Sequence, residues 1–198
     1  MGPPVYDVNY SVNIRLSSYL PTMAAPLTRS RVVEAALSVV AEEGLPGLSM
    51  RRVGRALGVE AMALYRHVRN KDDLLDAIYD HLVAQVDAPV GGPWDDEVEA
   101  LATCFRDVIF ANRACVPLLA TRPGTTPAAL AMIDRGIRVF QRAGFDDDAA
   151  IDAFQTVFAF VVGHAVFHTA GGQLPDDAIA RREFERGLGW ILVGLRNG

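Results

Sequence analysis

The sequence predicts an all-α protein, in which a three-helix helix-turn-helix head is joined by a long helix to a larger helical body. Three observations predict this fold. Apolar residues recur at helical spacing from residue 28 onward, no stretch alternates as a half-buried strand does, and breaks containing glycine or proline separate segments of ordinary helix length. We therefore divide the chain into an irregular arm over 1–27, a head over 28–73 and a body over 74–198.

The helices of the head are predicted from their ends. Residues whose side-chain oxygen can accept a backbone N–H mark three helix starts: Thr28, Ser49 and Asn70. Gly44 and Gly58 are expected to end the first and second helices, because glycine readily leaves the helical conformation. A short third helix is expected from Glu60 to about His67. The helix that begins after Asn70 should bury an apolar stripe made of Leu74, Leu75, Ile78, Leu82 and Val86.

The body is expected to contain five further helical segments, over 94–113, 115–121, 126–143, 147–170 and 177–196. The breaks before and between them hold glycine or proline and fall at 88–93, 122–124, 143–144 and 171–175. The arm contains four prolines and no periodicity, so a loosely packed tail is the expected structure there.

The formal net charge of −5 conceals an uneven distribution. Residues 28–71 hold eight Lys and Arg against four Asp and Glu, whereas the rest holds 11 against 20. A basic head on an acidic body can bind a polyanion locally and still remain soluble. The two cysteines, the absence of a secretory signal pattern and the absence of a run of roughly 18 apolar residues predict a soluble, cytoplasmic protein without a membrane partner.

Two short helices that meet at Gly58 form the centre of a helix-turn-helix. Apolar residues should hold the angle between them: Val53, Leu57, Val59, Leu64 and Val68. The outward residues are then Arg51, Arg52, Arg55, Ala61, Met62, Ala63, Tyr65, Arg66 and His67. In such a module the second helix enters the major groove of DNA, and Arg15 of the arm could also reach DNA. Spacing alone leaves a helical hairpin packed inside a bundle equally open.

The run GLSMRRVGRALGVEAMALYRHVRNKDDLL at 47–75 resembles the DNA-binding head of the tetracycline-repressor (TetR) family. The positions that carry this resemblance are Leu64, Tyr65, His67, Val68, Lys71, Leu74 and Leu75, and the match runs from about 28 to 78. The body is more loosely similar to the tetracycline-repressor branch, through Trp94, the Thr-Arg-Pro turn at 121–123, residues 143–145 and residues 160–163. The resemblance implies a ligand-responsive regulator of transcription.

The resemblance also implies which residues touch DNA. Ser49, Met50 and Arg51 open the supporting helix, and Ala61, Met62 and Ala63 occupy the base-facing edge. Tyr65, His67 and Lys71 match phosphate-contacting positions. The apolar base-facing edge can meet thymine methyl groups but makes no bidentate hydrogen bonds, so base discrimination should depend on Arg51 and on Arg66, with guanine as the favoured partner.

For the body, the resemblance implies a homodimer formed through the last two long helices, and a palindromic DNA operator. The apolar faces expected there contain Ile151, Phe154, Phe158, Val162, Leu188, Trp190, Ile191 and Leu195, with Gly187, Gly189 and Gly194 allowing close helix approach. A pocket for a small-molecule effector is also implied. Its expected wall residues are Leu101, Phe105, Ile109, Leu118, Arg122, Ile133, Asp134, Ile137, Phe158, Val162 and Phe167. Arg122 either orients an anionic or carbonyl ligand or simply caps the preceding helix.

Metal chemistry receives little support from the sequence. Leu118 and Phe167 stand where the tetracycline repressor holds a magnesium–drug chelate, and neither offers an oxygen or imidazole ligand. The expected effector is therefore apolar or aromatic, with no cofactor and no metal site. His164 and His168 have a spacing that can bind zinc, which leaves a helical metal-dependent enzyme as one alternative. A regulator whose body only dimerises is another, and core or pocket histidines explain the pair most simply.

Overall fold

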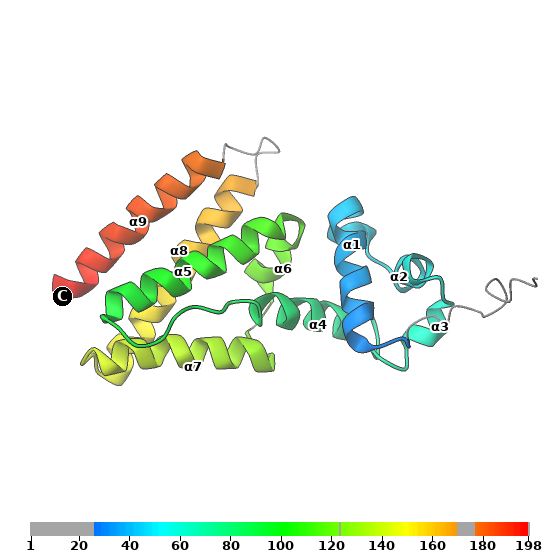
Figure 1. The fold of residues 1–198 in the computed structure, drawn as a ribbon, viewed down its shortest axis with the longest axis horizontal. Helices are drawn as coiled ribbons and strands as arrows, with labels where there is room; N and C mark the ends of the chain where they lie inside the picture. The colour runs from blue at the N-terminus through cyan, green and yellow to red at the C-terminus, as the bar shows by residue number, and fades with distance from the viewer. Residues whose placement is uncertain (1–25, 123, 170–176, 198) are drawn as a thin grey trace, which may run out of the picture.

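The computed structural model describes residues 26–122, 124–169 and 177–197, and all the regular structure in these ranges is helical (Figure 1). The elements are α1 (Arg29–Gly47), α2 (Met50–Leu57), α3 (Ala61–Leu64), α4 (Lys71–Val83), α5 (Trp94–Ala111), the 3-10 turn η2 (Arg113–Cys115), α6 (Val116–Thr121), α7 (Pro127–Arg142), α8 (Asp147–Thr169) and α9 (Asp177–Asn197). The predicted all-α class is confirmed. Arg15, nearly all of the arm and the break at 171–175 lie outside the described residues.

The helix starts in the head lie where the capping residues predicted them. The side chains of Thr28 and Ser49 each accept a backbone N–H at 3.3 Å, from Arg31 and Arg52 respectively. The side chain of Asn70 accepts the N–H of Asp73 at 2.8 Å. Each cap satisfies one of the backbone donors that a helix start leaves without a partner, so the sequence determines these boundaries locally.

Two helix ends differ from the prediction. Gly44 leaves the helical conformation, with φ at 71°, but the chain makes one more turn around Pro46 before α1 ends at Gly47. The third helix ends at Leu64 rather than near His67. After Leu64 the chain tightens into a turn, in which the carbonyl of Leu64 accepts from the N–H groups of both His67 and Val68. The segment expected to be one helix over 60–67 is therefore a single helical turn followed by a tight turn.

The turn between α2 and α3 depends on two glycines. Gly58 ends α2 with φ at 68°, in the left-handed region that glycine adopts without steric cost. A Cβ atom at Gly54 would lie 2.8 Å from the carbonyl oxygen of Val59, so this position lets the turn pack directly on α2. Beneath the turn, Val53, Leu64 and Val68 are buried, as the sequence predicted.

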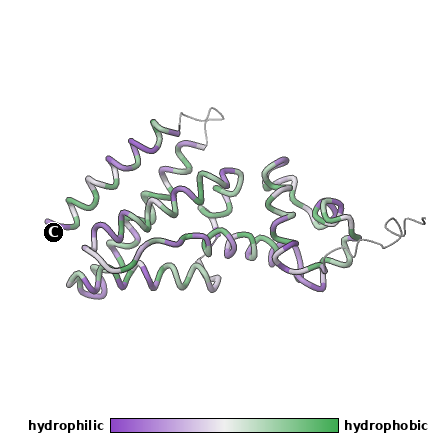
Figure 2. Tube along the Cα trace, viewed as in Figure 1, coloured by the Kyte–Doolittle hydropathy of each residue, from purple (hydrophilic) through white to green (hydrophobic). Residues whose placement is uncertain are grey.

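The body is a bundle around α8, which packs against α5, α6, α7 and α9. Apolar and polar stretches alternate along most of its helices (Figure 2), as expected for helices with one covered face. By length and composition alone α8 could cross a membrane, and 28% of its most apolar 18-residue window is buried. Its contacts with four neighbouring helices identify it as the central helix of a bundle. Its exposed apolar side chains lie on a face that no other described helix covers.

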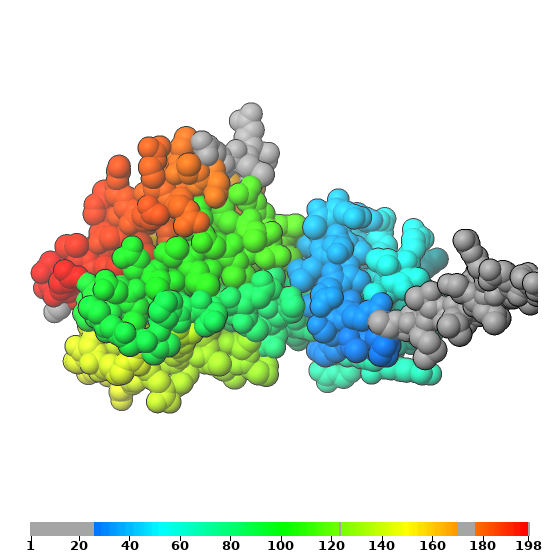
Figure 3. All heavy atoms as spheres, viewed as in Figure 1, coloured from blue at the N-terminus to red at the C-terminus, as the bar shows by residue number. Residues whose placement is uncertain are grey.

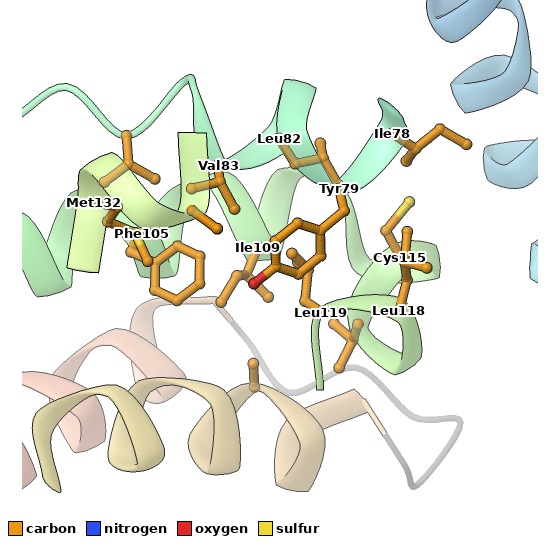
Figure 4. Close-up of a cluster of buried hydrophobic side chains, with 14 of the residues drawn as sticks. Ile78, Tyr79, Leu82, Val83, Phe105, Ile109, Cys115, Leu118, Leu119 and Met132 are labelled. Atoms are coloured by element: carbon orange, nitrogen blue, oxygen red, sulfur yellow. The ribbon is translucent and has the colours of Figure 1, made fainter. Parts of the chain in front are cut away.

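Helix α4 belongs to both lobes of the molecule (Figure 3). It packs against α1 of the head and against α5, α6 and α7 of the body. Figure 4 shows Ile78 on the side of the cluster nearest the head, while the ring of Tyr79 extends between Ile109 and Leu119 of the body. Leu82 on the same helix is fully buried. The boundary expected between residues 73 and 74 therefore falls inside a helix that the two lobes share. Of the predicted apolar stripe, Leu74, Ile78 and Leu82 are fully buried.

Candidate functional site

The head presents a mixed basic and apolar surface at the end of the molecule away from the body (Figure 1). Met62 on α3 is 75% exposed and Tyr65 after it is 45% exposed. Ala61, Ala63 and His67 are partly exposed beside them. The predicted base-facing edge and the predicted phosphate-contacting side chains thus lie together on α3 and on the turn that follows it.

Exposed cations surround this surface. Arg51 on α2, Arg66 after α3 and Lys71 at the start of α4 are all exposed, as expected. Arg55, which the helix-turn-helix pattern also predicted to face outward, and Arg69, which it did not name, are exposed as well and extend the basic surface. Their signal in the sequence was the excess of basic residues over 28–71. Arg52 is less available to contact another molecule, because its guanidinium pairs with Glu43 of α1.

The prediction that the Met50 side chain faces DNA is wrong. Its side chain is only 9% exposed and packs in the core of the head, so it is not a DNA-facing group of α2. Position 50 opens the helix, and only its backbone is available to a phosphate there. The Ser49 hydroxyl beside it already accepts a hydrogen bond as the helix cap.

An ion pair fixes where α4 begins relative to the rest of the head. Arg29 donates to both carboxylate oxygens of Asp73, at 3.0 and 3.3 Å, and to the carbonyl of His67 at 2.7 Å. Asp73 also accepts the backbone N–H of Arg69 at 2.7 Å. The hydrogen bonds from Arg29 are the largest reason that the pKa of Asp73 is lowered to about 2. This pair links the start of α1, the turn after α3 and the first turn of α4.

The body contains a small cavity between α5, α7 and α8. Its volume is about 30 Å³, which holds a water molecule or two and is far below the size of a typical ligand pocket. Phe158 stacks on Phe105 and on Phe154, with ring centroids 5.6 and 5.9 Å apart. The lining residues are all apolar or glycine: Val98, Leu101, Ala102, Phe105, Met132, Gly136, Phe140, Phe154, Val157, Phe158 and Val161.

The structure brings only part of the expected pocket wall together. Leu101, Phe105 and Phe158 line the cavity. Ile109 and Leu118 are buried, in the packed cluster around Tyr79 (Figure 4). Ile133, Ile137 and Val162 are partly buried outside the cavity lining. Phe154 and Phe158 line the cavity and Leu188 is buried, so these three residues form the interior of the chain, the alternative to the apolar dimer face expected for them.

Three expected wall residues lie elsewhere. Phe167 is 78% exposed, because α8 turns this position away from the bundle. Asp134 is exposed and accepts from Arg138 one turn later on α7, at 2.8 Å. Arg122 neither enters the cavity nor acts only as a helix cap, because its guanidinium pairs with Asp72 and Asp76 of α4.

Arg122 completes a row of contacts along one side of α4. Asp80, one turn after Asp76, accepts the backbone N–H of Ala128 at the start of α7, at 2.7 Å. Asp73 holds the head end of the same helix through Arg29. The sequence did not predict these pairs, because nothing in local spacing reveals a partner 46 or 50 residues away.

Leu118 and Phe167, which stand where the tetracycline repressor holds its magnesium–drug chelate, are not suited to bind a magnesium ion. Leu118 is 4% exposed among apolar residues and Phe167 faces outward, so neither side chain offers a donor atom to a hard cation. His164 and His168 are different, because they lie together on α8 with ring centroids 4.3 Å apart. Burial is the largest reason that the pKa of His164 is lowered to about 4, so its ring is neutral at pH 7.

Comparison with known proteins identifies the family. Residues 32–78 match the family model described as bacterial regulatory proteins, tetR family. Residues 88–186 match the model of the tetracyclin repressor-like C-terminal domain. The chain belongs to the TetR family. The family expected from the helix-turn-helix and from the loosely similar body is therefore confirmed.

Individual TetR-family relatives extend the comparison. HTH-type transcriptional repressor DrrR1 from Streptomyces coeruleorubidus is 35% identical, over 70% of this chain and 53% of its own length. The class A tetracycline repressor from transposon 1721, from Escherichia coli, is 34% identical, over 85% of this chain and 90% of its own. The chain thus spans about half the length of the first of these relatives and most of the second.

Two solved structures share the fold closely. The TetR family protein ActR from Streptomyces coelicolor, in complex with actinorhodin, superposes with a TM-score of 0.75 at 27% identity, covering 86% of this chain and 96% of that one. BioQ with its double-stranded DNA operator superposes with a TM-score of 0.74 at 26% identity, covering 87% and 100%.

The Arg29–Asp73 pair predicts how the stability of the protein depends on pH. Because the pKa of Asp73 is about 2 in the folded state and 3.8 ordinarily, its ion pair stabilises the fold above about pH 4. That contribution is lost as the pH falls from about 4 toward 2. We expect Asp73→Asn to lower the free energy of unfolding by about 2 kcal/mol at pH 7. Urea unfolding of both proteins should show the difference narrowing below pH 4.

Asp148→Asn is the matched control, since Asp148 is an exposed carboxylate in the first turn of α8. It should change the unfolding free energy by no more than about 0.5 kcal/mol. A difference between Asp73→Asn and wild type that stays constant down to pH 2 would show that the pair does not set the pKa of Asp73.

Proposed function

We propose that this chain is a dimeric, ligand-responsive transcriptional repressor that binds a palindromic operator and is released by an apolar or aromatic small molecule. One observation supports this most directly. Helix α4, which carries the exposed Lys71 in the head, also packs on α5 and α7, two of the three helices that line the apolar cavity of the body. A change in the body can therefore move the head.

The exposed surface of α2, α3 and the start of α4 supports binding to the major groove. Lys71, Tyr65 and His67 are placed to contact phosphates, which fix the position of a protein on DNA without reading its sequence. Arg51 is exposed and free to read a guanine edge, and Met62 is the most exposed of the three apolar residues that can meet thymine methyl groups. The BioQ structure contains an operator bound by a chain of the same fold.

Exposed apolar side chains on α8 and α9 support dimerisation. Trp190 is 72% exposed and Val193 56%, and Ile179 lies on the same stripe of α9. On α8, Phe167 and Val166 are exposed beside the small residues Ala159 and Gly163. Large apolar side chains that are exposed on the last two long helices favour a protein–protein interface there. A second copy with the same face would close it around a two-fold axis.

The cavity supports an apolar effector, and its small volume means that the effector must open it. The stacked rings of Phe105, Phe154 and Phe158 offer flat aromatic surfaces and no polar side chain. Widening the cavity between α5, α7 and α8 would displace α7, which holds α4 through Asp80 and Ala128. ActR, which shares this fold, is solved with actinorhodin. The effector then acts by favouring the conformation in which the heads release DNA.

Catalysis plays no part in the proposal. The residues that line the cavity between α5, α7 and α8 are apolar or glycine and offer no acid, base or nucleophile. The family model that the head matches is one of regulatory proteins. A cytoplasmic location follows from this function, since the operator lies on the bacterial chromosome or on a plasmid.

DNA binding is tested with operators selected from a random duplex library. Tyr65→Ala and Lys71→Ala should each weaken binding about equally on all selected sequences, because they remove phosphate contacts. Arg51→Ala should cost about 1–3 kcal/mol on the selected operator and also relax the preference at one base pair. Fluorescence anisotropy at a fixed salt concentration measures both effects. Glu99→Gln, exposed on α5 of the body, is the control and should leave operator affinity unchanged. Unchanged affinity in all three head variants would contradict the proposed interface.

Dimerisation is tested by placing a charge in the exposed stripe of α9. Trp190→Glu should shift the sedimentation coefficient from dimer to monomer, because an unpaired charge in an apolar interface is strongly unfavourable. Operator affinity should fall with it, since only one head then contacts each palindrome. Glu185→Lys, exposed on α9 but outside this stripe, is the control and should leave the dimer intact. A monomeric wild type would contradict the proposal.

The effector cavity is tested with a panel of planar aromatic compounds that includes actinorhodin. A compound that binds the native state should raise the melting temperature and weaken operator binding. Ala102→Leu places its added methyl groups in the cavity and should abolish both responses while preserving operator binding. Ala111→Leu, exposed at the end of the same helix, is the matched control. If no compound acts, the body serves dimerisation without an apolar effector.

A further inference from the structure

Three metal-ligating side chains meet where α8 packs on α9. His164 and His168 lie on α8 and Glu183 lies on α9, and one ligand atom from each residue lies within 4.8 Å of the other two. The Nε2 atom of His168 is 3.2 Å from a carboxylate oxygen of Glu183. Sequence spacing alone indicated the histidine pair but not its third member, which is contributed by another helix.

The packing of the two helices builds this arrangement. His164 and His168 are one helical turn apart, so both rings project from the same face of α8. Gly187 lets α9 approach that face closely, because a Cβ atom there would lie 2.7 Å from the ring of Phe160. The ring of His164 also meets Phe184 of α9 edge-on, with centroids 5.4 Å apart. The ligands therefore come from a well-packed part of the bundle.

The distances suit a small transition-metal ion. Two ligands about 2.1 Å from a zinc ion at the tetrahedral angle lie about 3.4 Å apart. The pair formed by His168 and Glu183 matches this spacing, and the ligand atom of His164 lies within 4.8 Å of both. Two imidazoles and one carboxylate form a ligand set that zinc uses with water in the fourth position. Imidazole also favours zinc over magnesium or calcium.

The surroundings of His164 add an independent observation. Among the described residues, neither ring nitrogen is paired by a well-formed hydrogen bond, although both are shielded from solvent and the backbone of Ala180 lies near the ring. A buried polar atom without a partner is costly, and a metal ion would satisfy one nitrogen. The nearby cation Arg106 is itself neutralised by Asp107 and Asp177, at 2.8 and 3.0 Å.

We propose that His164, His168 and Glu183 bind one zinc ion per chain, with water as the fourth ligand. The ion joins α8 to α9 and so stabilises their packing. Because Glu183 is 57% exposed while the His168 side chain is 9% exposed, the site opens to solvent on the α9 side and can exchange its ion. This site does not depend on the proposed DNA binding or on the effector cavity.

The test is zinc binding to the untagged, chelator-treated full chain, in competition with a chromogenic chelator. We expect one equivalent per chain. Glu183→Gln and His168→Gln should each weaken binding at least about tenfold, because even outer-shell partners of a metal contribute that much. Glu185→Gln, two residues along the same helix, and His81→Gln on α4 are matched controls that should leave binding unchanged.

Two further readouts separate a metal site from a structural role of these residues. Cobalt should give the visible absorption of a tetrahedral complex in wild type, and lose it in Glu183→Gln. Zinc should raise the melting temperature of wild type and of both controls, but not of the two ligand variants. The proposal is overturned if wild type binds no zinc, or if the ligand variants bind it as tightly as the controls. Glu183 is exposed, so its variant decides the matter even if the histidine variant fails to fold.

Discussion

A single helix with four aspartates along its length holds the two lobes of this molecule in one arrangement. At the head end of α4, Asp73 is bound by Arg29. Further along, Asp72 and Asp76 are bound by Arg122 of the body, and Asp80 caps the start of α7. Isolated surface ion pairs contribute little to stability, but these four aspartates act as a row. Asp72, Asp73 and Asp76 pair with arginines, and Asp80 accepts a backbone N–H from α7. The direction in which the head points depends on this row.

The apolar residues of α4 reinforce the same constraint. Ile78 is buried on the side nearest the head, and Tyr79 is buried with its ring between Ile109 and Leu119 of the body (Figure 4). A helix that is buried on both sides cannot shift without disturbing one lobe or the other, because interiors are close-packed. In the proposed function, these close-packed contacts of α4 would carry a movement of the body to the head.

The sequence predicted the features that depend on residues close together in the chain, and it missed those that depend on residues far apart in the chain. Helix starts at Thr28, Ser49 and Asn70 were predictable, because a cap is formed by residues three positions apart. The pairing of Arg122 with α4 was not, since its partners are 46 and 50 residues away in sequence. Periodicity correctly marked Phe154 as apolar, but it could not decide between the cavity and an outer face. For the same reason, the prediction that Phe167 lines the effector pocket is wrong, because this apolar side chain is exposed.

If the cavity takes the effector as proposed, its closed state decides how sensitively the protein responds. A site that holds only a water molecule or two must open before a larger compound enters, so the apparent affinity is the intrinsic affinity reduced by the fraction of molecules that are open. The concentration threshold of the switch is then a property of side-chain packing as much as of ligand contacts. Under the proposed function, substitutions at lining residues such as Met132 or Val157, which loosen or tighten that packing, would shift the threshold through the fraction of open molecules as well as through ligand contacts.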